Sequence, residues 1–238
     1  MKPHFDKRMV FLAAGLAGIL FFQIFDKGVV SVKQNFCKRL ALLVLGLILD
    51  GFGSALIVCC NLGSDPFNVL AQGLSRLTCL QIGTVSMCIH TVLLALILLG
   101  GGKRHIGFGT VVGIFIVGTV INACSSMLWV LLGYAGVWVR LLCLLTAPVF
   151  VGIGVAAIQM AKLGSLPNDI MPLLIHEKLH IFQYRTIRIL YDTTLFITGF
   201  LLGGTVGAGT VLMAFLIGPC IQSAQKAFCR LMPNAQPI

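Results

Sequence analysis

Charged side chains are scarce in this chain of 238 residues, since aspartate, glutamate, lysine and arginine together make up only 10% of it. Apolar residues make up 58%, and 27 glycines add to them. A water-soluble domain is about 25% charged and about 45–50% apolar with glycine included. This composition excludes an ordinary soluble globule, a disordered chain and a nucleic-acid-binding domain. It predicts that the protein's surroundings are a lipid bilayer.

Cysteine is also scarce, and the nine present are too few for the disulfide scaffold of a small secreted domain. Most lie in apolar runs, where cysteine acts as a small apolar side chain. The sequence lacks a G-x-S-x-G motif, a Walker loop and paired C-x-x-C motifs. No stretch outside the apolar runs is long enough to fold as a soluble domain. These absences predict a chain that is not an enzyme and that holds no cofactor or metal.

Six apolar segments are long enough for a transmembrane helix, which needs about 20 residues. They are 40–60, 82–100, 108–132, 139–161, 184–202 and 208–229. A seventh apolar stretch, 9–25, follows a basic leader, but no small-residue cleavage site comes after it. We expect this stretch to be an uncleaved hydrophobic extension, and its depth in the membrane stays open.

The basic residues predict the orientation of the chain. Suppose that all six segments cross the membrane. One side then holds only two of the lysines and arginines after residue 26, namely Arg76 and Arg140. The other side, which holds both ends of the six-helix core, is then cytoplasmic because basic residues collect there. We expect an inner-membrane protein with a cytoplasmic C-terminus.

The chain contains an internal duplication. Residues 51–70 align with 152–171, sharing a Leu-Gly-Ser-x-Pro motif, and residues 107–121 align with 207–221, sharing a Gly-x-Gly-Thr motif. Each copy predicts three long helices and a short half-helix that starts at the proline. Three crossings are an odd number, so the second copy enters from the opposite side, as in many secondary transporters. A duplication that only builds a symmetric scaffold is the alternative.

The predicted fold is therefore an all-α polytopic membrane protein of two inverted three-helix repeats, each with a half-helix, plus an N-terminal hydrophobic segment. We place the extension at 1–37, the first repeat at 38–133 and the second at 134–238, the two repeats forming one membrane domain.

Two stretches carry a family resemblance. LGLILDGFGSALIVCCNLGSDPFNVLAQGLSRLTCLQIGT and GFLLGGTVGAGTVLMAFLIGP resemble the YczE/YyaS/YitT group of bacterial integral membrane proteins, over roughly residues 38–228. The resemblance implies a polytopic inner-membrane protein and no particular substrate. The chain departs from the group in its N-terminal segment and at Asp50, where an apolar residue is expected, so no role for Asp50 follows from the resemblance.

The two Leu-Gly-Ser-x-Pro loops are candidate binding elements. Pro66 and Pro167 suit the first turn of a helix, and Asp65 is a good N-cap. Two facing half-helix N-termini would bind an anionic or zwitterionic solute. An extramembrane loop with a surface helix is the alternative. The candidate solute-binding residues here are Ser64, Asp65, Asn68, Ser165, Asn168 and Asp169.

Polar residues within the apolar segments are further candidates, because a bilayer makes them costly. They are Asp50, His90, Asn122, Arg188, Asp192 and Gln222. Asp50 would suit a carboxylate that couples transport to a proton or sodium ion. Arg188 and Asp192 are four residues apart and can form an ion pair on one helix, with a structural or a functional role. The Gly-x-Gly-Thr motifs favour close helix packing.

His176-Glu177-Lys178-Leu179-His180 matches the zinc-binding H-E-x-x-H motif, and Leu49-Asp50-Gly51 resembles the aspartate triplet of intramembrane metalloproteases. In those proteases the histidine motif comes first, whereas here it follows the triplet. The duplication also accounts for this segment without zinc. A metalloprotease is therefore a remote alternative.

The favoured function is a permease-like transporter of an unidentified small solute, with its site between the repeats. A non-transporting membrane scaffold or sensor is the main alternative. A transporter needs its polar residues in one hydrated cavity, whereas a scaffold can satisfy them singly. Gly109-x-x-x-Gly113 offers a contact face for a homo-oligomer, although packing within the chain is the simpler use.

Overall fold

The computed structural model describes residues 36–179 and 182–231, and these residues are helical with no strand among them. The described α-helices are α2 (Phe36–Cys60), α3 (Pro66–Thr78), α4 (Ile82–Leu99), α5 (Phe108–Gly133), α6 (Val137–Ala161), α7 (Pro167–Leu179), α8 (Tyr184–Leu201) and α9 (Ala208–Leu231). A short 3-10 turn, η1 (Lys103–His105), follows α4. The all-α prediction is confirmed, and all six predicted segments form helices. The predicted segment 9–25 lies outside the described residues.

Five of the described helices, α2, α4, α5, α6 and α9, are long and apolar enough to cross a membrane. The sixth predicted segment, α8, has 18 residues but carries Arg185, Arg188 and Asp192, so it is less apolar than the other five. Both α3 and α7 have 13 residues, a length of about 20 Å, which is shorter than the hydrocarbon core of a bilayer. These two helices are as short as predicted.

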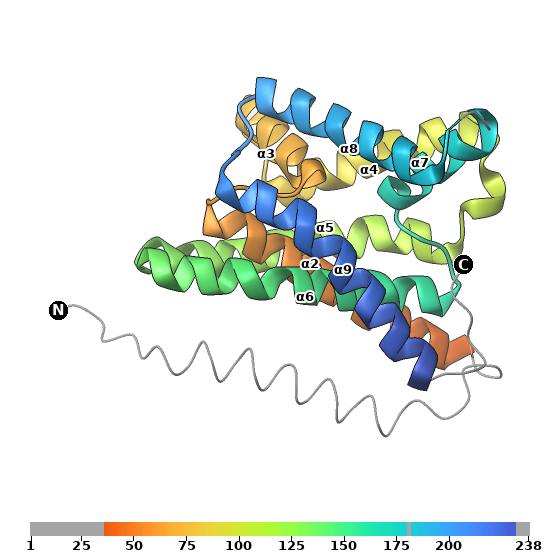
Figure 1. Cartoon of the computed structure of the whole chain (residues 1–238), viewed down its shortest axis with the longest axis horizontal. Helices are drawn as coiled ribbons and strands as arrows, with labels where there is room; N and C mark the ends of the chain where they lie inside the picture. The colour runs from red at the N-terminus through yellow and green to blue at the C-terminus, as the bar shows by residue number, and fades with distance from the viewer. Residues whose placement is uncertain (1–35, 180–181, 232–238) are drawn as a thin grey trace.

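The helices lie in two layers (Figure 1). In one layer α2 packs against α5 and α6, and α6 packs against α9. In the other, α3 and α7 each pack against both α4 and α8. The layers are joined where α4 packs against α5, whereas α8 makes at most slight contact with α9.

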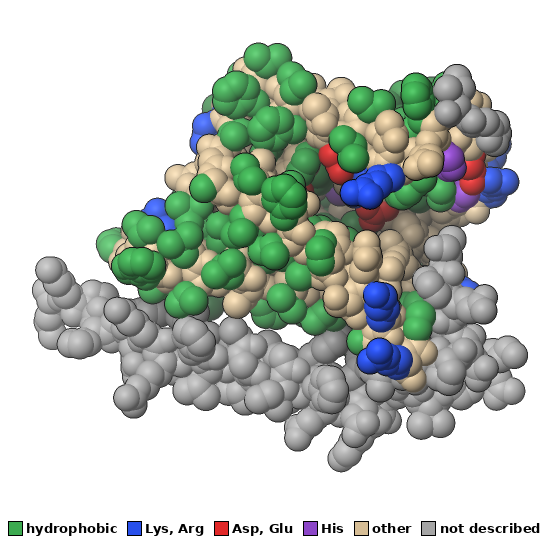
Figure 2. All heavy atoms as spheres, viewed as in Figure 1, with side chains coloured by type: hydrophobic (Ala, Val, Ile, Leu, Met, Phe, Trp, Pro, Cys, Tyr) green, Lys and Arg blue, Asp and Glu red, His purple; other side chains and the backbone are tan. Residues whose placement is uncertain are grey.

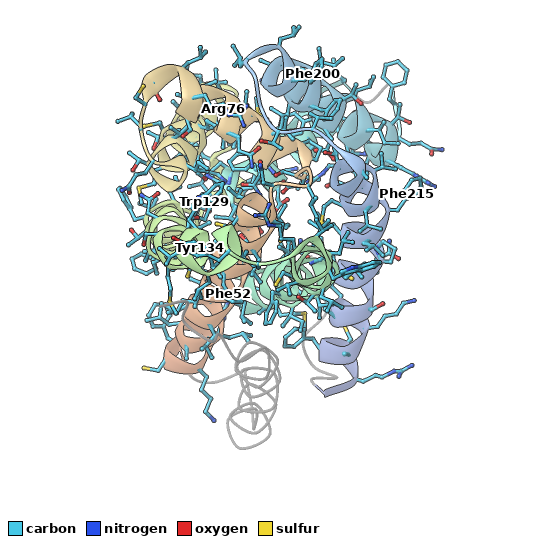
Figure 3. All side chains as sticks on the ribbon, turned by 90° about the vertical axis from the view of Figure 1, so that its left-hand side faces the viewer. Phe52, Arg76, Trp129, Tyr134, Phe200 and Phe215 are labelled. Atoms are coloured by element: carbon cyan, nitrogen blue, oxygen red, sulfur yellow. The ribbon has the colours of Figure 1, made fainter. Side chains whose placement is uncertain are left out.

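The outer surface is rich in large apolar side chains. Trp129, Tyr134, Phe200 and Phe215 are all exposed, and they lie on the outside of the helices (Figure 3). Side chains of this kind are stable in contact with lipid and costly in contact with water. The apolar surface therefore agrees with a membrane location.

Two matched backbone hydrogen bonds join the halves of the chain. The amide of Gly109 donates to the carbonyl of Leu163 at 2.8 Å, and the amide of Gly209 donates to the carbonyl of Leu62 at 2.9 Å. Each Gly-x-Gly-Thr turn thus holds the loop of the other half. Gly113 packs against Leu166 in the same region, so the Gly109-x-x-x-Gly113 pattern serves packing within the chain.

The loops themselves require glycine. Gly63 has a φ of +116° and Gly164 a φ of +117°, which side-chain-bearing residues rarely adopt. A Cβ on Gly63 would lie 2.7 Å from the Thr210 amide nitrogen, and one on Gly164 would lie 2.6 Å from the Thr110 hydroxyl oxygen. Backbone conformation and close approach therefore both favour glycine at these two positions.

Gly63→Ala and Gly164→Ala should each lower the free energy of unfolding by about 1–3 kcal/mol, from strain at positive φ and from overpacking. Thermal unfolding of the purified chain in detergent measures the effect. Gly133→Ala is the matched control, because a Cβ there meets open space. Equal melting temperatures for all three variants would contradict the role of these loops.

Candidate functional site

Asp65 and Asn68 organise the start of α3. Asp65 is the N-cap: its carboxylate accepts from the Asn68 amide nitrogen at 3.4 Å and from Asn68 Nδ2 at 2.6 Å. The predicted N-cap is confirmed. Asn68 is only 3% exposed, and its Oδ1 is buried without a hydrogen-bond partner among the described residues.

The start of α7 is tied to α8 by charged and polar contacts. Arg188 donates to Asp169 at 3.1 Å and to Asp192 at 3.3 Å. The Tyr191 hydroxyl donates to Asn168 Oδ1 at 2.9 Å. The ion pair predicted within α8 is confirmed. Arg188 also binds a second carboxylate, which the sequence analysis did not anticipate.

Asp50 lies midway along α2 and is 6% exposed. No hydrogen bond or ion pair joins its carboxyl group to another residue in the described ranges. Its nearest charged neighbours by electrostatic interaction are two further acids, Asp65 and Asp169. Asp50 is therefore a buried acid that has no cation beside it within the described chain.

His90 on α4 is 3% exposed, and its Nδ1 lies 2.9 Å from the Ser86 carbonyl oxygen. A carbonyl can only accept, so Nδ1 carries the hydrogen and Nε2 of the neutral ring keeps a free lone pair. The Phe67 ring packs against the imidazole with 4.5 Å between centroids. His90 also interacts electrostatically with Asp169.

These residues form one group, which we call the charged cluster. It consists of Asp50, Asp65, His90, Asp169, Arg188 and Asp192, linked by ion pairs and by electrostatic interactions. Its members come from α2, the following loop, α4, α7 and α8, so both layers contribute. Figure 2 shows acidic and basic side chains gathered in a hollow in the middle of a largely apolar face.

The charged cluster has an open side and a closed side. The side chains of Arg188, Asp169 and Asp192 keep 31%, 24% and 33% of their surface exposed, whereas Asp50 and His90 are almost fully buried. The ion-paired residues of the cluster therefore lie nearer the surface than Asp50 and His90. It contains four of the five acidic residues that the structure describes.

Two predicted serines lie in the loops rather than in the cluster. Ser64 accepts from Gln72 Nε2 at 3.0 Å, and Gln72 Oε1 accepts from the Thr205 amide at 3.0 Å. Gln72, which the sequence analysis missed, thus ties α3 to the α8–α9 connection. Ser165 is half-buried and makes no hydrogen bond within the described ranges.

The two predicted amides, Asn122 and Gln222, have different surroundings. Asn122 Oδ1 accepts from the Gly83 amide at 2.8 Å, and its Nδ2 donates to Thr84 at 3.0 Å, so Asn122 joins α5 to the start of α4. Gln222 is exposed and makes no hydrogen bond to another described residue. The structure does not bring either amide into the charged cluster.

The H-E-x-x-H segment makes other contacts. His176 Nδ1 lies 2.9 Å from the Phe182 carbonyl oxygen, and Glu177 pairs with His105 and Arg104. Hydrogen bonds from His105 and then from Arg104 hold the pKa of Glu177 below its usual value. His180 lies outside the described residues. Within the described ranges, no three His, Cys, Asp or Glu residues lie close enough to hold a metal ion.

Comparisons with known proteins point to membrane proteins without a named activity. A family model described as a family of unknown function, DUF6198, matches residues 37–226. An uncharacterised protein of Haemophilus influenzae is 29% identical over 82% of this chain and 86% of its own length. The uncharacterised protein YyaS of Bacillus subtilis is 27% identical over 73% of this chain and 86% of its own. The uncharacterised membrane protein YczE of the same organism is 26% identical, over 79% and 85% respectively. No solved structure matches the chain.

Arg188→Gln should destabilise the protein by about 1–3 kcal/mol, because it leaves Asp169 and Asp192 unpaired beside further acids. Adding Asp169→Asn to that variant should restore part of the loss. Thermal unfolding measures both effects. Arg185→Gln is the control, since Arg185 lies on the same helix, is exposed and makes no ion pair within the described ranges. If Arg185→Gln is as harmful as Arg188→Gln, the ion pairs do not stabilise the fold.

Proposed function

The chain belongs to DUF6198, a family of membrane proteins of unknown function, and we propose that it is a permease-like transporter of a small solute in the inner membrane. The solute enters the hollow that contains the charged cluster. In this proposal α8 crosses the membrane with the five more apolar helices, and the C-terminus is cytoplasmic.

The observation that supports this proposal is that the ionisable side chains of the charged cluster lie together in one place. Ionisable side chains within a membrane are costly, and they commonly mark the path of a solute or ion. A scaffold could satisfy each of them singly with a neighbouring group. Here ionisable residues from five elements interact in one cluster, and Asp50 has no partner of its own within the described residues. This arrangement suits a binding site better than a set of structural contacts.

Matched contacts near the ends of the two short helices, α3 and α7, support the inverted repeats. Arg76, near the end of α3, donates to the Gly203 carbonyl and to Thr205 in the α8–α9 connection. Glu177 is the residue aligned with Arg76 in the second copy, and it pairs with Arg104 and His105 in the α4–α5 connection. The end of each short helix is thus joined to a connection between two long helices of the other half, and we call each of these contacts a latch. Rocking of one half against the other would open the latches in turn.

Thiol labelling tests this proposal. Single cysteines at Lys103 and Val206, in a chain whose nine native cysteines have been replaced, should react with a membrane-impermeant reagent from opposite sides of the membrane. A cysteine at Asn168 should react because it lies beside the charged cluster. A cysteine at Leu144, which is buried in the apolar core, should stay unlabelled.

Two outcomes would contradict the proposal. Labelling of Lys103 and Val206 positions from the same side would exclude inverted repeats. An unreactive cysteine at Asn168, with both loop positions reactive, would mean that the cluster is dry and would favour a scaffold.

A further inference from the structure

We propose that the charged cluster binds a solute with a positively charged nitrogen, an organic ammonium group, and that Asp50 is its counter-ion. This inference rests on the proposed transport function and specifies the class of solute. It reverses the anion preference that the half-helices suggest from sequence.

The balance of charge in the cluster favours a cation. Four carboxylates, those of Asp50, Asp65, Asp169 and Asp192, share one guanidinium. Arg188 lies between Asp169 and Asp192 and binds both. Asp65 is stabilised by the α3 N-terminus and by Asn68. Asp50 alone is left without a stabilising partner in the described chain, and a buried carboxylate requires one.

Two hydrogen-bond acceptors have no donor among the described residues: one is on Asn68, which binds Asp65, and one is on His90 of the charged cluster. Asn68 Oδ1 is buried and has no hydrogen-bond partner among the described residues, while Nδ2 of the same side chain donates to Asp65. His90 Nε2 keeps a free lone pair because Nδ1 donates to Ser86. A buried acceptor without a donor is costly, so the ligand should supply N–H groups. An ammonium supplies them, and a carboxylate or phosphate anion does not.

The N-termini of α3 and α7 are not free to bind an anion. Asp65 caps α3, and Asp169 lies in the first turn of α7. Each short helix therefore already has a carboxylate where its dipole would attract an anionic solute. A second anion beside these acids would be repelled.

An organic cation fits better than a bare metal ion. The described His, Cys, Asp and Glu residues do not approach one another in threes closely enough to chelate a metal. The Phe67 ring packs on His90 with 4.5 Å between the ring centroids, and aromatic rings attract ammonium groups. An alkylammonium can use both the dispersed acceptors and this ring.

Thermal unfolding of the full chain in lipid nanodiscs, titrated with matched probes, tests the inference. n-Butylammonium should raise the melting temperature, whereas n-butanol, n-butyrate and sodium chloride at equal concentration should not. Asp50→Asn should weaken the apparent affinity for n-butylammonium at least tenfold, and Asn68→Ala should weaken it by a smaller factor. Arg185→Gln, which removes an exposed charge outside the cluster, should leave the affinity unchanged.

Several results would overturn the inference. They are stabilisation by n-butyrate instead of n-butylammonium, an equal effect of sodium alone, and n-butylammonium binding that survives both Asp50→Asn and Asn68→Ala. In each case transport of another solute would still stand if the Asn168 cysteine is reactive. Conversely, n-butylammonium binding that depends on Asp50, without uptake of the labelled compound into proteoliposomes, would uphold the site and refute transport.

Discussion

The reciprocal backbone hydrogen bonds between Gly109 and Leu163, and between Gly209 and Leu62, are the constraint on which the rest of the structure depends. Each bond fixes the loop of one half against the turn of the other. The loops lead directly into α3 and α7, so the bonds also fix where these short helices begin. Asp65, Asn68, Asn168 and Asp169 lie at those two starts, and their positions follow from the same contacts.

The two aligned halves share loop and turn motifs, but they do not share their charged residues. Asp50 in the first half aligns with Val151 in the second, and Asp65 aligns with Leu166. In the second half the charges lie instead on α7, as Asp169, and on α8, as Arg188 and Asp192. The two halves thus contribute different groups to one site: the first supplies buried acids and an imidazole, and the second supplies a guanidinium paired with two carboxylates nearer the surface.

Helix positions and local contacts were predictable from sequence because they depend on neighbouring residues. Apolar runs predicted the positions of the helices, and the four-residue spacing of Arg188 and Asp192 predicted their ion pair. Contacts between different helices were not predictable, such as those of Arg188 with Asp169 and of Tyr191 with Asn168, which join α7 and α8. Asn122 and Gln222 occupy equivalent positions but differ in surroundings, because α4 packs closely on α5 and α8 does not pack closely on α9.

The same reciprocal bonds impose an order on biosynthesis. The Gly109–Leu163 bond can form once the ribosome has made about two thirds of the chain. The loop at Leu62, although made early, receives the amide of Gly209 only near the end of translation. During most of its synthesis the first half therefore has a loop whose Leu62 carbonyl lacks this partner, and a chain that stops before α9 never gains it.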